Sequence, residues 1–437
     1  MRRTIALLAL LLLAPAADAA WTGPTLSAPH TFLDDPTLIV SGNGGALAGW
    51  RFQQGLGNGS RAGFEGAGRA PGAAAFGAPG AIVKATSVNR PLTTVSGLEP
   101  YGRSGALLAL IAPGPGGAPQ ARLGVRFGSI GGRFGTLRTI RRARAYTIAR
   151  ASLAVNARGD AALAWFEDRG VNTDRVYVAL RRAGKAFGKP RWLATGRVRG
   201  VAAAIGARGD ALVAWDARGV VRTRFKPRAR AGFRATDTIR SKPAYFDEMA
   251  PVVTPSGRAV LAWSAQFSSE GGDRGPIYFQ AAARPAGADR FARAKLLETI
   301  PAAADDGLGR PIDAVVDSTG AVAVAWRGAT GVRAVRGTGA AQAISAPGST
   351  AVLSDLAAGP GGRLAVVWDG GVDDPQSVVR AAIADGPGAG FGPPEDVSDT
   401  GQEARFGHAA FLGERPAVVL SSRAAGGGDS VARAYVR

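Results

Sequence analysis

The 437-residue chain contains no cysteine, which excludes disulfide bonds, thiolate metal sites and a lipid-anchored N-terminal cysteine. Lysine is scarce, with six residues against 47 arginines, and there are only two histidines and two methionines. No apolar run approaches the roughly 20 residues of a membrane-spanning helix, so a transmembrane segment is not expected. The fold must therefore be stabilised by burial of apolar surface alone.

Residues 1–19 have the pattern of a secretory signal peptide. Two arginines precede an apolar run over 5–13, and Pro15 and small alanines follow it. We therefore expect the mature chain, 20–437, to be secreted, either to the exterior or to the periplasm. Its length would admit two or three ordinary domains or one long repeat fold.

A repeated unit organises the mature chain. The stretch VNARGDAALAW, 155–165, returns as IGARGDALVAW at 205–215. In each copy a glycine is followed six positions later by a large apolar residue, and this pair recurs about every 53 residues, within the range of propeller blades. The eight glycines are Gly44, Gly105, Gly159, Gly209, Gly257, Gly320, Gly362 and Gly413.

Each unit is predicted to be a four-stranded antiparallel meander. Apolar runs on both sides of the glycine indicate a β-hairpin, and a third run and a Phe-Gly-introduced fourth follow, as at Phe187-Gly188. In the second run the residues two, four and six positions after the glycine are large, whereas the fifth is mostly small. Those two sets point to opposite faces of a strand. The tryptophan that commonly stands at the sixth position is therefore expected in the core.

The eighth unit supplies only three strands, the third being SVARAYVR. Residues 21–29, WTGPTLSAP, match the fourth-strand segment FGPPEDVSD of the seventh unit in their aromatic residue, Gly-Pro pair and extended tail. Pairing this N-terminal strand with the last unit would close the ring and remove exposed sheet edges. We therefore predict an all-β fold, a single β-propeller with eight four-stranded blades; a ring of seven blades is the alternative.

The segments VSDTGQEARFGHAAF, AVNARGDAALAW and RRAGKAFGKPRWLATG resemble the tandem repeats of secreted bacterial β-propeller proteins, a group loosely associated with sialidase-like propellers. The resemblance spans nearly the whole mature chain and implies the blade fold. Sialidases carry an Asp-box, S-x-D-x-G-x-x-W, in which three positions separate Gly from Trp, whereas six separate them here. Sialidase activity is therefore not carried over to this chain.

The Arg-Gly-Asp tripeptides at 158–160 and 208–210 fall in the turn of the predicted hairpin. Other units place Pro255-Ser256-Gly257 or Ser318-Thr319-Gly320 in the same slot, so the turn requires only a small residue that reaches positive φ. The arginine and aspartate are interpreted as having no role of their own. Adhesion-receptor binding through these tripeptides is not expected.

One face of the predicted ring, the long-loop face, carries the second-to-third-strand loops and the links between blades. Loops on a rigid scaffold commonly carry binding groups. The candidate ligand-binding residues there are His30, Asp34, Asp35, Tyr245, Asp247, Glu248, Asp305, Asp306, Glu403 and His408. The competing interpretation is that these side chains are solvated or structural.

Both histidines should lie near the ring seam together with Glu403. A histidine beside a carboxylate can act as an acid or base, but two histidines without a third ligand do not predict a metal site. The chain also has no H-E-x-x-H, P-loop or G-x-S-x-G motif. No catalytic residue, metal or cofactor is therefore assigned.

Charge is uneven along the chain. The segment 175–242 holds 18 basic and three acidic residues, whereas 355–403 holds two basic and nine acidic ones. Within RTRFKPRAR, five basic residues share one parity and would form a stripe on a strand; these polyanion-binding candidates are Arg222, Arg224, Lys226, Arg228 and Arg230. A solvated strand face that discourages edge pairing is the alternative.

Two functional hypotheses follow. The first is a secreted, non-catalytic binding or scaffold propeller for an extracellular or envelope glycan, or for a protein partner. The second is a sialidase-like glycoside hydrolase or polysaccharide lyase that acts from the long-loop face. An acidic polymer is a possible partner, nucleic acid is disfavoured because no aromatic pattern accompanies the arginines, and a monomer is expected.

Overall fold

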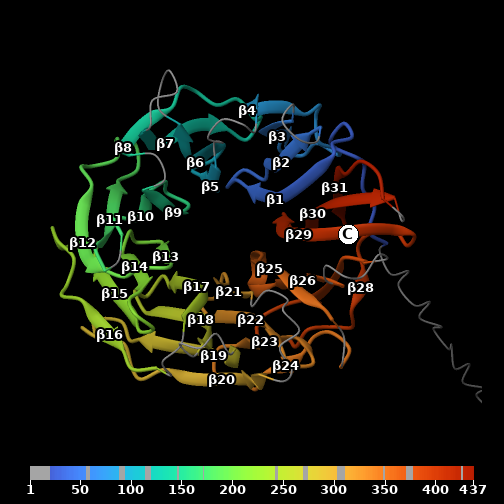
Figure 1. Cartoon of the computed structure of the whole chain (residues 1–437). Coiled ribbons are helices and arrows are strands. Elements are labelled where there is room, and N and C mark those ends of the chain that lie inside the picture. The colour runs from blue at the N-terminus through green and yellow to red at the C-terminus, as the bar shows by residue number, and fades with distance from the viewer. Residues whose placement is uncertain are drawn as a thin grey trace, which may run out of the picture.

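Eight antiparallel sheets stand around a central axis in the computed structural model of the chain (Figure 1). Within the residues that the structure describes, seven sheets have four strands and the last sheet has three. The first strand of each sheet lies nearest the axis, and the later strands follow outward (Figure 1). The prediction of an eight-bladed propeller is confirmed, and the seven-bladed alternative is wrong.

The structure describes most of the chain. The described ranges are 20–55, 60–87, 94–113, 120–144, 147–170, 172–241, 245–268, 274–302, 311–347, 350–370, 377–424 and 427–437. The predicted signal peptide, 1–19, lies outside them. In the described ranges, no helix combines the length and apolar composition needed to cross a membrane.

The first four blades occupy the N-terminal half of the chain. Blade 1 contains β1 (Phe32–Val40), β2 (Ala46–Gln54), β3 (Arg61–Arg69) and β4 (Gly80–Ser87). Blade 2 contains β5 (Thr94–Tyr101), β6 (Gly105–Pro113), β7 (Gln120–Ser129) and β8 (Arg138–Arg144). Blade 3 contains β9 (Ile148–Val155), β10 (Ala161–Glu167), β11 (Asp174–Arg181) and β12 (Arg191–Gly196). Blade 4 contains β13 (Val201–Ile205), β14 (Ala211–Asp216), β15 (Val221–Lys226) and β16 (Asp237–Ile239).

The last four blades complete the ring. Blade 5 contains β17 (Tyr245–Val253), β18 (Ala259–Ser268), β19 (Arg274–Arg284) and β20 (Lys295–Ile300). Blade 6 contains β21 (Ile312–Val316), β22 (Val322–Gly328), β23 (Gly331–Arg336) and β24 (Gln342–Ala343). Blade 7 contains β25 (Val352–Ala358), the short 3-10 turn η4 (Pro360–Gly362), β26 (Leu364–Asp369), β27 (Arg380–Ala384) and β28 (Glu395–Asp396). Blade 8 contains β29 (Gln402–Leu412), β30 (Arg415–Ala424) and β31 (Val431–Val436).

The turn between the first two strands of each blade needs backbone freedom at one position. In blade 3 that position is Gly159, whose φ is +90°, a conformation that costs glycine little. Blade 2 differs from the predicted register, because its turn spans 102–104 and Gly105 is already the first residue of β6. A Cβ on Gly105 would lie 2.5 Å from the Tyr101 ring, so glycine is required there by close approach.

The tryptophans of the repeat lie in the core, as predicted. Trp50, Trp165, Trp215, Trp263, Trp326 and Trp368 are each at most 2% exposed. They stand on the second strand of their blades, where small residues such as Ala164 and Ala214 face the other side. The second strand of blade 3, β10, is buried along its whole length. Neighbouring blades therefore pack together through alternating bulky and thin faces.

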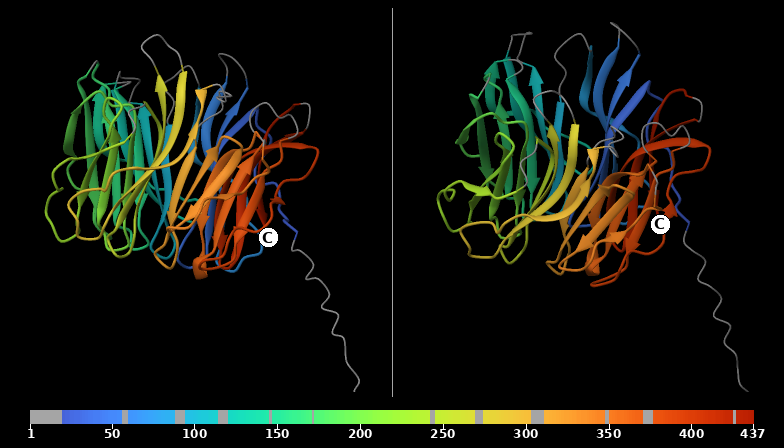
Figure 2. Two further views of the ribbon diagram at one scale, coloured as in Figure 1. Left: turned by 90° about the horizontal axis from the view of Figure 1, so that it is seen from below. Right: turned by 60° about the horizontal axis from the view of Figure 1, so that its bottom comes forward.

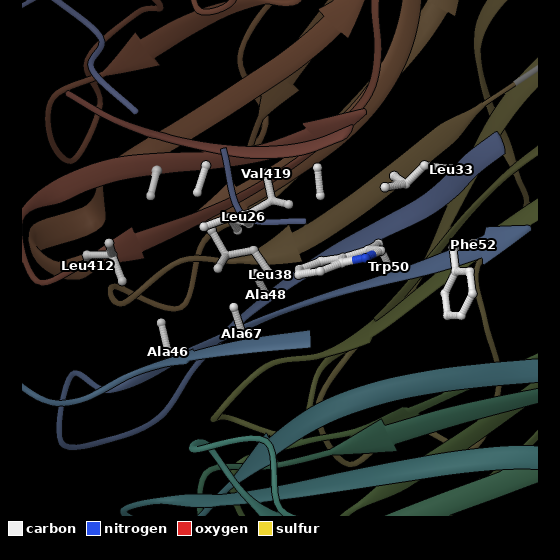
Figure 3. Packing of buried hydrophobic residues seen from close by; sticks show 13 residues of the cluster. Leu26, Leu33, Leu38, Ala46, Ala48, Trp50, Phe52, Ala67, Leu412 and Val419 are labelled. Atoms are coloured by element: carbon white, nitrogen blue, oxygen red, sulfur yellow. The ribbon is translucent and has the colours of Figure 1, made fainter. Parts of the chain in front are cut away.

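The N-terminal segment closes the ring against blade 8. Thr22 and Val436 exchange two backbone hydrogen bonds, and His30 and Ser430 exchange two more. Leu26 packs between blades 8 and 1, near Leu412 and Val419 (Figure 3). The pairing consists of isolated bridges because Pro24 and Pro29 have no N–H to donate. The predicted closure is confirmed, in a less regular form than a full fourth strand.

The strands run between two loop-bearing ends of the ring (Figure 2). One end, the short-turn face, carries the first-to-second and third-to-fourth turns, and the other is the long-loop face. The inner strands therefore begin at the long-loop face. Residues at the starts of several inner strands can converge there on the central axis.

Candidate functional site

A pocket of about 490 Å³ lies on the central axis at the long-loop face. It is formed by the starts of inner strands from blades 1, 5, 6, 7 and 8, together with the end of β26. We call it the central pocket. Its charged and ionisable lining residues are Asp35, Glu248, Asp313, Asp369, Arg405 and His408. Three candidates predicted from the sequence, Asp35, Glu248 and His408, are thus brought together by the fold.

At four successive junctions, from blade 5 round to blade 1, a side chain on an inner strand joins one blade to the next by accepting a backbone N–H. The acceptor-to-nitrogen distances are 3.2 Å for Glu248 Oε2 to Ile312 N, 3.2 Å for Asp313 Oδ2 to Leu356 N, and 2.7 Å for Asp355 Oδ2 to Ala409 N. His408 Nδ1 continues the series by accepting from Leu38 N at 3.3 Å. These polar side chains therefore have a structural role in addition to any contact with a ligand.

Asp313, Asp355 and His408 form a short polar chain beside the central pocket. Burial raises the pKa of Asp313 well above its ordinary value, and the adjacent Asp355 charge raises it further. Asp313 hydrogen-bonds to Asp355, whose Oδ2 lies 3.4 Å from His408 Nδ1. Burial and the adjacent charge both favour the protonated form of the Asp313 carboxyl.

A second depression of about 210 Å³ adjoins the central pocket at the junction of blades 8 and 1. We call it the seam groove; it is lined by Phe32, Glu403, Arg405, Phe406 and Arg423, among others. Glu403 is buried, and its carboxylate lies 2.6 Å from both Arg405 Nη2 and Arg423 Nη2. The cluster carries one net positive charge, and Glu403 fixes the direction of both guanidinium groups.

Phe406 has a strained backbone and an exposed ring. Its φ is +58°, which is unusual for a bulky residue. The conformation occurs where the register of β29 shifts between Arg405 and His408, and Phe406 N donates to Asp369 Oδ2 at 3.1 Å. Phe406 is 47% exposed and lines both the seam groove and the central pocket. Strain of this kind is concentrated at functional sites in proteins.

Asp34 and Asp35 lie at the start of blade 1 near one guanidinium. Arg51 Nη1 is 3.6 Å from Asp34 Oδ2 and 4.0 Å from Asp35 Oδ2. Burial raises the pKa of Asp34, and the charge of Arg51 opposes that rise. Asp35 has a φ of +49°, so it is a second non-glycine residue of this pocket held in the left-handed region.

His30 occupies the closed junction of the ring and does not line the central pocket. It is 6% exposed, stacks on Phe52 at 4.4 Å, and places its ring nitrogens 3.2 Å from Gln54 Oε1 and 3.1 Å from Glu65 Oε2. Trp50 Nε1 donates to the same Glu65 oxygen. The contacts favour a structural role for His30 over the predicted role in ligand binding.

Four candidates from the sequence cannot be placed as side chains. Asp305 and Asp306 lie outside the described residues. Tyr245 and Asp247 belong to β17, but their side chains lie outside the described part of the chain. Their predicted role stays a prediction.

The predicted basic stripe is present in part. On β15, Arg222, Arg224 and Lys226 are half-buried on one side and alternate with buried residues. Arg228 and Arg230 lie beyond the end of the strand, in the following turn. The strand ends because Pro227 has no N–H for a ladder hydrogen bond. Three of the five candidates therefore share the strand and two do not, and the polyanion-binding role of all five stays a prediction.

Several residues of the site were not predicted from the sequence: Phe32, Asp313, Asp355, Asp369, Arg405, Phe406 and Arg423. Two of them, Asp313 and Asp355, could have been found from the sequence. Each lies inside an apolar run, seven positions before the turn glycine of its unit. A carboxyl within an apolar strand indicates a buried polar contact. Phe406 gave no such signal, because its exposure results from the register shift in β29.

The aspartates of the two Arg-Gly-Asp tripeptides have a structural role, although the sequence analysis interpreted them as having none. Asp160 and Asp210 are 7% and 6% exposed. Asp160 Oδ1 accepts Ala183 N at 2.9 Å, and Asp210 Oδ1 accepts Arg228 N at 2.8 Å, so each fixes the third-to-fourth turn of its blade. Their assignment as residues without a role was wrong, and their burial disfavours receptor contact.

The arrangement supplies hydrogen-bonding groups and an aromatic surface for an organic ligand. In the described part of the chain, no group of three or more His, Asp and Glu side chains is arranged to hold a metal ion. The central pocket and the seam groove together offer carboxylates, two guanidinium groups and two phenyl rings. Such a mixture suits a neutral or weakly charged polyhydroxylated molecule better than a cation or an apolar ligand.

The chain is a β-propeller structurally similar to sialidase propellers, at low sequence identity. A protein of unknown function from Dyadobacter fermentans is 13% identical over 95% of this chain and 97% of its own, with a TM-score of 0.43. NanB sialidase from Streptococcus pneumoniae is 11% identical over 94% of this chain and 70% of its own, with a TM-score of 0.39. The leech intramolecular trans-sialidase is 7% identical over 95% and 70%, with a TM-score of 0.41. No protein-family model and no curated protein matches the chain.

Proposed function

We propose that the chain is a non-catalytic binding propeller that holds a glycan in the seam groove and the adjoining central pocket. The observation that supports this most directly is the pair of Phe32 and Phe406, which are 50% and 47% exposed and line one groove. The C–H face of a sugar ring packs well on an aromatic ring, while its hydroxyls bond to charged groups nearby. Arg405 and Arg423, oriented by Glu403, supply those groups.

The backbone at Phe406 supports the same proposal. A bulky residue in the left-handed region costs roughly 1–3 kcal/mol, and glycine would adopt the same conformation without that cost. The ring is half-exposed and so recovers little of this energy by burial. Phenylalanine at this position is accounted for if its ring contacts a ligand.

An enzyme acting on a glycan from the long-loop face is the competing hypothesis. Its support is the gathering of Asp35, Glu248 and Asp313 in the central pocket. Asp313 and Asp355, however, hydrogen-bond to each other, whereas the two carboxyls of a glycosidase stand about 5–10 Å apart across the scissile bond. Since both also accept backbone N–H groups, we favour binding without catalysis.

Phe406→Gly separates ligand binding from folding. The variant removes the ring and relieves the strained backbone, so the unfolding midpoint should stay the same or rise, while retention on the bound glycan falls at least about tenfold. Wild-type and variant chains would be compared on immobilised neutral polysaccharides. Trp192→Ala is the matched control, because Trp192 is a 61%-exposed aromatic residue on β12, far from the groove.

The outcomes separate the hypotheses. Equal loss of binding in both variants, or unchanged binding in Phe406→Gly, would overturn the glycan site. Appearance of new reducing ends or unsaturated products on prolonged incubation would replace binding with hydrolase or lyase activity. Absence of retention on every polysaccharide, with capture of one protein instead, would favour a protein ligand.

The proposal places this binding outside the cytoplasm, in keeping with the signal peptide predicted at 1–19. Fractionation of the producing cells and N-terminal sequencing of the exported chain would test it. A mature N-terminus near Ala20 in the periplasm or medium is expected, and retention of the full chain in the cytoplasm would contradict the location.

A further inference from the structure

A basic groove lies on the short-turn face, on the opposite side of the ring from the proposed glycan site. It is a depression of about 350 Å³ between blades 3 and 4. Its lining has seven cationic residues, of which one, Arg181, is buried and donates to the backbone oxygens of Gly159 and Lys185. The other six are called the cations of the basic groove: Arg182, Lys189 and Arg191 come from blade 3, and Lys226, Arg228 and Arg230 come from blade 4. The two walls are the third-to-fourth turns of these neighbouring blades.

The six cations of the basic groove are not neutralised by the protein. In the described part of the chain, none of them forms an ion pair with a carboxylate. The only acidic lining residue, Asp160, is 7% exposed and is occupied by Ala183 N, Asn156 and Arg158. Five of the six cations are exposed, and Lys226 is half-buried. The groove therefore presents a concentrated positive charge to solvent.

The charge density of the groove affects Lys226 itself. Burial lowers the pKa of the Lys226 ammonium, and the charges of Arg182 and Arg191 lower it further. Cations on both walls are therefore close enough to repel one another across the groove. An anion placed between them would relieve that repulsion, so anion binding in the groove is electrostatically favourable.

Three hydrogen bonds hold the two walls in place. Asp160 accepts the backbone N–H of Ala183 in one turn, and Asp210 accepts that of Arg228 in the other. Arg191 Nη1 donates to Ala231 O at 2.9 Å and so bridges blade 3 to blade 4. Because the walls are ordered before binding, little conformational entropy is lost when a ligand is held.

We propose that the basic groove binds an acidic polysaccharide, with carboxylate or sulfate groups of successive sugars paired to cations on both walls. This site is independent of the proposed glycan site and goes beyond it. The lining contains no aromatic residue on which a nucleic-acid base could stack. A recessed groove with cations on both walls also suits a narrow chain better than a flat anionic membrane.

The stripe on β15 extends the surface available to such a polymer. Arg222 and Arg224 share one side of the strand with Lys226. A chain that left the groove along blade 4 would therefore meet further guanidinium groups. Binding should accordingly strengthen with polymer length until the stripe is covered.

Charge reversal on both walls tests the groove. Full-length Arg182→Glu/Arg228→Glu would be titrated with polygalacturonate, dextran sulfate and uncharged dextran over a series of NaCl concentrations. The wild-type chain should bind one or both acidic polymers with a Kd that rises steeply with salt, and the variant should bind at least about tenfold more weakly. The carboxylated and sulfated polymers distinguish the two kinds of acidic group.

Arg103→Glu/Arg133→Glu is the matched control. It makes the same change in net charge at two exposed arginines of blade 2 on the short-turn face, and its affinity should stay within about twofold of wild type. Equal weakening in both double variants would show a mere net-charge effect and overturn the site. Preference for single-stranded DNA over both polysaccharides, or dextran binding as tight as that of the acidic polymers, would also overturn it. Phe406→Gly should leave this binding unchanged, so the groove and the glycan site can fail independently.

Discussion

Glu99 lies on β5, an inner strand, at a position where other blades have an apolar residue. It lies opposite Leu107 on β6, and the equivalent positions hold Val155, Ile205 and Val253. The side chain is partly exposed, yet the protein around it removes enough water to raise the pKa of the carboxyl to about 8. Glu99 is therefore protonated at neutral pH.

Glu99→Gln should stabilise the protein in a pH-dependent way. Between the ordinary pKa of 4.5 and the raised pKa of about 8, the folded chain binds more protons at Glu99 than the unfolded chain does. The free energy of unfolding of the wild type therefore falls as pH rises through this window. The variant avoids that loss. Because the side chain is partly exposed, the expected gain is roughly 2 kcal/mol at pH 8, about half of the full linkage value, and near zero at pH 4.5.

Urea unfolding at both pH values would measure the effect of Glu99→Gln. Asp429→Asn, at an exposed carboxylate, is the control and should show no pH-dependent difference from wild type. A gain for Glu99→Gln that is the same at both pH values would contradict the raised pKa.

Asp313→Asn should change the free energy of unfolding little, whereas Asp313→Ala should lower it. Burial raises the pKa of the Asp313 carboxyl and so favours its neutral form. Asp313→Asn keeps a neutral side chain with a donor toward Asp355 and an acceptor for the backbone, so the loss of stability should stay within about 1 kcal/mol. Asp313→Ala leaves Leu356 N without its acceptor and should cost roughly 2–3 kcal/mol. Chemical denaturation at neutral pH measures both losses, and equal losses would contradict a role for Asp313 as a neutral hydrogen-bonding side chain.

At the scale of elements, the hairpin turn of blades 3 and 4 depends on two residues of each tripeptide. Gly159 supplies a φ of +90°, and Asp160 accepts a hydrogen bond from the adjacent third-to-fourth turn. Arg158 is half-exposed and pairs with Asp160 at 3.4 Å. The aspartate thus joins two turns of one blade, and the arginine contributes a partly solvated pair.

Asp160→Ala should lower the free energy of unfolding by about 1–3 kcal/mol, because the Ala183 N–H loses its acceptor in a buried turn. Arg158→Ala should change it by less than about 0.5 kcal/mol, as expected for a solvated ion pair. Thermal and urea unfolding of both variants would measure the difference. A larger loss in Arg158→Ala would show that the exposed pair, and not the turn contact, holds the blade.

At the scale of the whole molecule, the ring depends on the seam between the N-terminal segment and blade 8. Leu26 fills the core between blades 1 and 8, and backbone bonds join 22–30 to the last strand (Figure 3). Gly23 lies so close to β31 that a Cβ there would stand 1.9 Å from Ala434 O. No side chain fits at that position without displacing the segment.

Gly23→Val should therefore open the seam. Displacing the segment exposes the edge of β31 and apolar surface around Leu26, so the unfolding midpoint should fall by several degrees and the chain should associate as its concentration rises. Gly72→Val is a suitable control, since Gly72 is in an exposed turn with open space around its Cα, although its positive φ carries a local cost. Light scattering during size-exclusion chromatography would detect association, and a monomeric Gly23→Val chain with an unchanged midpoint would contradict the role of the seam.

The charge distribution also acts at the scale of the ring. Blades 3 and 4 carry the basic groove, whereas the acidic segment 355–403 falls mainly on blade 7, across the ring (Figure 1). The basic groove lies on the short-turn face and the proposed glycan site on the long-loop face, so the two proposed sites lie on opposite faces. A glycan at the seam and an acidic polymer at the groove could be held at the same time without competing for surface.

The glycine-to-tryptophan interval, the strand alternation and the unpaired last unit were enough to predict eight blades, core tryptophans and closure by the N-terminus. These features are periodic, and periodicity reflects backbone geometry that every blade repeats.

The candidate site was predicted only in part: Asp35, Glu248, His408 and Glu403 were found, whereas Asp313, Phe406 and the wall residues Arg182 and Lys189 were not. Their roles depend on which residues of different blades meet at the axis and between neighbouring turns. Only the closed ring brings residues hundreds of positions apart within contact distance, and only the register shift in β29 exposes Phe406.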